Sequence, residues 1–128
     1  MIDQQAAPVQ LRIATQPGQL RFARVTAATL AGDLPFTLRA VEDLRVAVDE
    51  LAAAAIDGCD DDDQLLLTFS VHDDAVVVEG RVTDAGEPPQ LHPVAKDILE
   101  LLADQYELGV DDGDRVFRLT KRPRSIDE

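Results

Sequence analysis

The sequence contains few residues of several types, and each shortage excludes a class of structure or function. Its 128 residues include a single cysteine, Cys59, so neither an internal disulfide nor a cysteine-rich zinc site can form. A free thiol is typical of a reducing compartment, and we expect a cytoplasmic protein. Tryptophan is absent and aromatic residues make up 4% of the chain, too few for a platform on which single-stranded nucleic acid could stack.

Long apolar runs and basic residues are also scarce. No apolar run approaches the roughly 20 residues that span a membrane, and the N-terminal segment carries an acid where an export signal carries bases. Lysines and arginines number 12 against 25 acids, which gives a net charge of -13 and a pI near 4.3. Such a surface repels nucleic acid phosphates and anionic lipids, so we expect neither as a partner, and a protein with a basic face is favoured. The alternative is that the acidity serves solubility alone.

The most regular pattern in the chain is the segment Val41–Ile56. Its apolar residues recur every three or four positions, which predicts a helix with one buried stripe. The stripe consists of Val41, Leu44, Val48, Leu51 and Ala55. Glu50 lies beside this stripe, and Ala54 follows it one turn later on the same side. The residues at positions 50 and 54 therefore determine which catalytic roles this helix can support.

The remaining patterns predict one domain over residues 9–121, between a short flexible lead-in at residues 1–8 and a polar tail at residues 122–128. Alternating and helical spacings predict, in order, a strand at 9–13, a helix at 19–31, a helix that Thr37 caps and that ends near Ile56, strands at 65–71 and 76–82, a helix from 94 to about 105, and strands at 106–110 and 116–120. This order predicts an α/β two-layer sandwich, with a mixed sheet of about five strands and three helices on one face. Because the other face then needs a cover or solvent, we expect a homodimer or a partner contact.

The acidic run Asp60–Asp63 is the obvious candidate for a metal site, since clustered carboxylates attract calcium. The twelfth position of an EF-hand loop is a bidentate glutamate, but that position counted from Asp60 is Val71. We therefore expect no metal here and interpret these acids as solvated turn residues after a helix.

Four segments together resemble one known family. Phe22–Thr26 is similar to the first helix of the sporulation anti-sigma factor, and Val41–Glu50 resembles the segment that leads into the family's N-box. Val82–Gly86 resembles a D-x-G adenine motif, and Arg118–Lys121 is similar to the family's closing strand. On these segments, from about Leu11 to Lys121, the chain resembles the GHKL (Bergerat-fold) ATP-binding family, in its bacterial anti-sigma factor serine-kinase branch. The resemblance implies a histidine-kinase-like ATPase fold.

The resemblance also implies a role for four residues. Glu50 would be the general base of phosphoryl transfer, Asp84 would accept a hydrogen bond from the adenine amino group, and Gly86 would let the backbone pass close to the base. Arg24 matches the helix arginine with which the family contacts its sigma factor and antagonist. Each residue also has a structural interpretation: a solvated helix acid for Glu50, a strand-end turn for Asp84 and Gly86, and a helix-surface charge for Arg24.

Two departures from the family pattern affect the chemistry. Ala54 stands where the family has the asparagine that holds magnesium, and a methyl group cannot coordinate a metal. No glycine occurs between Gly86 and Gly109, so the glycine-rich lid that cradles the phosphates has no counterpart. His92 could contact a phosphate at a helix start, but a capping or exposed histidine explains it as well.

These features favour a regulator that binds a sigma factor or a related regulatory protein and has lost kinase and ATPase chemistry. The alternative is an active ATP-dependent protein-serine kinase acting on an anti-anti-sigma factor, which requires ATP or ADP binding with magnesium. A third reading is a scaffold or dimerisation module without a sigma partner.

Overall fold

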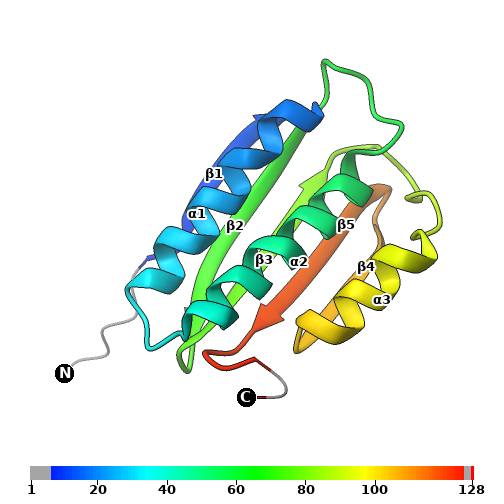
Figure 1. The fold of residues 1–128 in the computed structure, drawn as a ribbon. Coiled ribbons are helices and arrows are strands. Elements are labelled where there is room, and N and C mark those ends of the chain that lie inside the picture. The colour runs from blue at the N-terminus through cyan, green and yellow to red at the C-terminus, as the bar shows by residue number, and fades with distance from the viewer. Residues whose placement is uncertain (1–6, 126–127) are drawn as a thin grey trace.

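One five-stranded sheet and three helices make up the protein, with the helices layered on a single face of the sheet (Figure 1). The structure, a computed structural model, describes residues 7–125 and 128. Its elements are β1 (Val9–Ala14), a 3-10 turn η1 (Pro17–Gln19), α1 (Leu20–Gly32), α2 (Leu38–Ile56), β2 (Gln64–His72), β3 (Ala75–Val82), α3 (Pro93–Leu102), β4 (Gln105–Asp111) and β5 (Asp114–Lys121). The predicted lead-in at 1–8 lies mostly outside the described residues. In the described part of the chain, no helix has the length and apolar character required to cross a membrane.

Helix α2 lies between α1 and α3 in the helix layer (Figure 1), and it buries the stripe that its periodicity predicts. Its apolar stripe packs on the sheet, and Leu44, Val48 and Leu51 are completely buried. The Thr37 hydroxyl accepts a hydrogen bond from the Ala40 amide at 3.0 Å, which confirms the predicted N-cap. The burial of this stripe therefore fixes the orientation of Glu50 and Ala54, which lie beside it.

The sheet is antiparallel throughout, in the order β1-β2-β3-β5-β4, so the prediction of a mixed sheet is wrong. Two helices connect β1 to β2, and the chain therefore returns in the opposite direction. Helix α3 connects β3 to β4, which do run parallel, but β5 lies between them and pairs with both. Strands β2 and β3 lie inside the sheet.

Local turn chemistry sets the ends of several elements. Asp112 and Gly113 have φ angles of 53° and 83°, which is the two-residue turn that the Asp-Gly signal predicts for the last hairpin. Asp73 and Asp74, with φ angles of 52° and 66°, form the same kind of turn between β2 and β3. Helix α3 ends at Leu102 instead of near residue 105, because the next residue is extended (φ -94°, ψ 143°) and leads into β4.

The face of the sheet opposite the helices is polar. Ion pairs cross it between Arg118 and Glu79 (3.3 Å) and between Arg81 and Asp114 (2.5 Å). An antiparallel sheet can face water on one side when that side carries polar residues. This face therefore requires no cover, and the homodimer remains a prediction.

Candidate functional site

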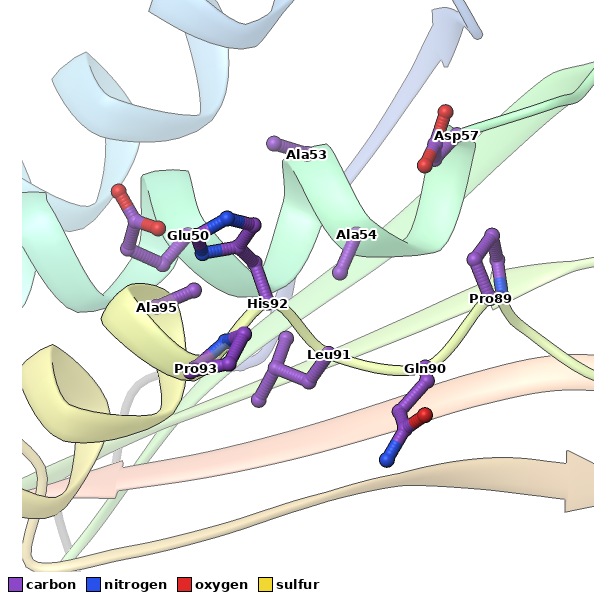
Figure 2. Close-up of a pocket in the computed structure, with 10 residues that line it drawn as sticks. All are labelled: Glu50, Ala53, Ala54, Asp57, Pro89, Gln90, Leu91, His92, Pro93 and Ala95. Atoms are coloured by element: carbon purple, nitrogen blue, oxygen red, sulfur yellow. The ribbon is translucent and has the colours of Figure 1, made fainter.

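A pocket of about 620 Å³ lies between α2 and the proline-rich segment 87–93 that leads into α3 (Figure 2). Its residues come from the C-terminal half of α2 and from the segment and the first turn of α3. They are Glu50, Ala53, Ala54, Asp57, Pro89, Gln90, Leu91, His92, Pro93 and Ala95. The structure thus brings Glu50, Ala54 and His92 to one cavity, although the last is about 40 positions from the others in the chain.

The charges of this pocket are unfavourable for a nucleotide. Its lining includes the two carboxylate residues Glu50 and Asp57 and no lysine or arginine. Phosphates bind where cations or backbone amides neutralise them, and two carboxylates repel them. Among residues 7–125 and 128, no group of three or more histidine, cysteine, aspartate or glutamate side chains is arranged to hold a metal ion. The lining therefore supplies no side-chain cation that would neutralise phosphate charge.

His92 acts as the N-cap of α3. Its Nδ1 accepts a hydrogen bond from the Val94 amide at 3.2 Å, so this ring nitrogen is engaged with the helix end. A helix N-terminus attracts anions through its exposed amides, and the cap occupies one of them. The geometry therefore supports the interpretation of His92 as a capping residue.

Asp84 and Gly86 lie outside the pocket, in the turn that follows β3. Neither residue is part of its lining. Asp84 is exposed with a φ of 57°, and its backbone amide donates to the Asp114 carboxylate at 2.9 Å. Gly86 has a φ of 70°, which favours glycine, and its amide donates to the Gly113 carbonyl at 3.0 Å. These contacts make both residues part of a turn that packs against the β4–β5 hairpin.

The side chain of Arg115 joins this turn to the end of α2. It extends from β5 on the helix side of the sheet and is 6% exposed. Its Nη1 donates to the carbonyls of Ala55 at 2.9 Å and Asp57 at 2.7 Å at the helix end, where the Cys59 thiol also donates to the Ala55 carbonyl at 3.7 Å. The other guanidinium nitrogens donate to the carbonyls of Ala85, Gly86 and Glu87 at 3.3, 3.4 and 3.0 Å. The space between α2 and residues 85–87 is therefore occupied by a guanidinium group.

Sequence reasoning missed Arg115, although a signal was present. The alternation Arg115, Phe117, Leu119, Lys121 places all four side chains on the buried face of β5, so two cations stand at apolar positions. Lys121 is completely buried, with its Nζ 3.9 Å from the Asp104 carboxylate. A buried cation in a strand is rare. Arg115 has five carbonyl acceptors, whereas the Lys121 Nζ has no hydrogen-bond partner within the described residues.

Arg24 lies between α1 and α2 rather than on an open surface. Its Nη1 forms an ion pair with the Asp49 carboxylate at 2.6 Å, and its side chain is 34% exposed. The acidic run is also engaged locally, because the Thr15 hydroxyl donates to the carbonyls of Asp60 and Asp63 at 2.6 and 3.2 Å. Both observations agree with structural roles for these residues in the isolated chain.

The sequence matches no protein-family model, and a search of curated proteins finds no similar sequence.

Proposed function

We propose that this chain is an anti-sigma-factor-like transcription regulator with the histidine-kinase-like ATPase fold. In this proposal it binds a sigma factor or a related regulatory protein in the cytoplasm, and phosphoryl transfer has been lost. The element order and the helix layer on one face of the sheet are compatible with that fold. The carboxylates and the Ala54 methyl group in the pocket beside Glu50 support the loss of nucleotide chemistry.

The observation that carries the binding proposal is the outer surface of α1. Phe22 and Val25 are 40% and 59% exposed, one turn apart. The Arg21 guanidinium lies 4.8 Å from the centre of the Phe22 ring, and Arg24 follows on the side that faces α2. Exposed aromatic and arginine side chains of this kind dominate the binding energy of protein interfaces. The net charge of -13 favours a partner with a basic face for the molecule as a whole, but helix α1 carries no acid. Because Arg24 is paired with Asp49, Arg21 is the α1 cation that would face an acidic group of a partner at this surface.

Size-exclusion chromatography with the sigma factors of the source organism tests this proposal. We expect one of them to form a stable complex with the purified protein. Val25→Asp should abolish that complex because it places a charge at the centre of the apolar contact. Val94→Asp is the matched control, since Val94 is also a helix valine with 59% exposure but lies on α3. Failure with every sigma factor, or equal binding by both variants, would contradict the proposal.

Calorimetric titration with ATP, with and without magnesium, separates this function from the kinase alternative. We expect no binding at millimolar nucleotide, because neither Glu50 nor Asp57 attracts phosphate and Ala54 offers no ligand. Magnesium-dependent binding would instead support an active protein-serine kinase. Light scattering on the same samples measures the predicted homodimer.

A further inference from the structure

Strand β4 forms one edge of the sheet, and the backbone groups along that edge point outward. Its hairpin with β5 closes on the pair Asp111–Asp114 around a two-residue turn. Such a closing pair is hydrogen-bonded, and hydrogen-bonded pairs recur at every second residue. The N–H and C=O groups of Tyr106, Leu108 and Val110 therefore point away from β5, toward the open edge.

A second pocket, of about 650 Å³, lies against the same strand. Its walls come from β4, from the segment 87–91 and from Lys96 of α3. The lining residues are Glu87, Pro88, Pro89, Gln90, Leu91, Lys96, Tyr106, Leu108, Gly109 and Val110. The residues of β4 whose backbone groups face the edge also line this pocket. A strand added to this edge would place every second side chain against these walls.

The charges around this edge indicate which kind of segment can bind there. Glu107 lies on the outer side of β4 and Glu87 lines the pocket, where Lys96 is the single cation of the lining, whereas Asp111 is already paired with Arg81 at 2.6 Å. A second copy of the chain would bring the same acids against each other, in a protein of net charge -13. A segment that carries lysine or arginine instead meets opposite charges.

We propose that β4 binds an extended, basic segment of a partner protein, which adds to the sheet as a sixth strand. The apolar side chains of the segment enter the pocket beside Leu91 and Leu108. Its alternate lysine or arginine side chains lie on the outer face near Glu107. This surface is separate from α1, because α1 covers the β1 side of the sheet and β4 is the opposite edge (Figure 1). The proposal therefore does not depend on sigma factor binding.

A synthetic peptide of alternating lysine and valine, labelled for fluorescence anisotropy, tests this proposal. We expect saturable binding, with amide chemical-shift changes confined to residues 87–91 and 105–111. The same peptide with N-methyl groups on alternate residues should not bind, since it cannot form the ladder of backbone hydrogen bonds. Failure of the first peptide to bind, or equal binding by both peptides, would overturn the proposal.

Variants at Val110 test the backbone contact directly. Val110 is 43% exposed, and proline at this position removes an outward N–H group without removing a bond to β5. We expect Val110→Pro to weaken peptide binding by about tenfold or more, whereas Val110→Thr, which keeps the amide, should bind like the unmodified protein. Circular dichroism establishes that both variants are folded. If the folded Val110→Pro variant binds the peptide normally, the edge does not bind a basic partner segment. The same conclusion follows if the unmodified protein is a dimer and the Val110→Pro variant is a monomer, because the edge then joins two copies of the chain.

The charge contribution is measured through its salt dependence. Glu107→Gln should weaken peptide binding and reduce its dependence on salt, because it removes a carboxylate beside the added strand. Glu42→Gln is the matched control, since Glu42 is an exposed acid on α2 and does not line the pocket at β4. Equal effects of the two substitutions would mean that the peptide responds to net charge alone, which would overturn the proposed site.

Discussion

Replacement of Arg115 by methionine tests whether the buried guanidinium holds α2 to the turn after β3. The side chain of Arg115 donates to two carbonyls at the end of α2 and to three in residues 85–87, at distances between 2.7 and 3.4 Å. Methionine keeps most of the unbranched apolar stem, so the packing of the stem changes little. The substitution therefore measures the loss of the hydrogen bonds.

The expected cost follows from the burial of these acceptors. The hydrogen bond to the Ala55 carbonyl is the buried one, and without Arg115 this carbonyl keeps only the weak Cys59 thiol donor at 3.7 Å. Leaving a buried acceptor largely unsatisfied costs about 1–3 kcal/mol. The other four carbonyls are partly buried, and water can replace much of what each loses, so we add about 1–2 kcal/mol for them together. The free energy of unfolding should thus fall by about 3 kcal/mol, which corresponds to a decrease of roughly 10 °C in Tm for a domain of this size.

Urea unfolding and amide hydrogen exchange provide the measurements. The Gly86 amide, which donates to the Gly113 carbonyl, should exchange faster in the Arg115→Met variant because the turn is no longer held. Arg118→Met is the control on the same strand: its ion pair with Glu79 at 3.3 Å is about half exposed, so we expect a change below about 1 kcal/mol. A change within about 0.5 kcal/mol for Arg115→Met would refute this account of the guanidinium.

Four further substitutions have expected outcomes in the same unfolding assay. Gly80→Ala should cost about 1–3 kcal/mol, because a Cβ atom would lie 2.2 Å from the Phe117 ring, whereas Gly109→Ala, with no atom within 4 Å, should change stability by less than about 0.5 kcal/mol. Thr37→Ala should cost about 1 kcal/mol through loss of the helix cap, and no loss would show that the cap is redundant. Hydrogen bonds from a backbone amide and from an arginine lower the pKa of Asp114. Its contribution to stability is therefore present above the unfolded pKa of about 3.9 and is lost as the pH falls through the lower folded pKa. Asp114→Asn should accordingly lose less stability in acid than the unmodified protein.

The regular elements could be predicted because their periodicities are strong. The stripe of α2 and the Asp112–Gly113 turn each combine a clear spacing with the appropriate cap or turn residue, and both lie where the sequence predicts. The direction of strand pairing could not be read in the same way. The position of β5 between β3 and β4 depends on contacts across the sheet, which no local pattern encodes.

The candidate site likewise contains residues whose placement the sequence could predict and residues whose placement it could not. Glu50 and Ala54 share a pocket because helix geometry places residues four apart on one side, and this holds in any fold. Whether Asp84 faces that pocket depends instead on how the turn after β3 packs. Arg115 determines this packing from a strand about 30 residues later in the chain, so the motif around Asp84 alone could not predict it.

Hydrogen bonds hold both ends of α2 in place, and this affects where a partner can bind. At its N-terminal end the Thr37 amide donates to the Pro123 carbonyl at 3.0 Å, and the Ser125 hydroxyl donates to the Asp43 carboxylate. At its C-terminal end Arg115 binds the last carbonyls. A helix held in this way cannot shift without breaking these hydrogen bonds, of which the one from Arg115 to the Ala55 carbonyl is buried. The pocket beside the helix is therefore not expected to open for a large ligand. The cationic surface of α1 and the acidic edge at β4 lie on opposite sides of this fixed core (Figure 1). Two partners of opposite charge could therefore bind at the same time without displacing each other.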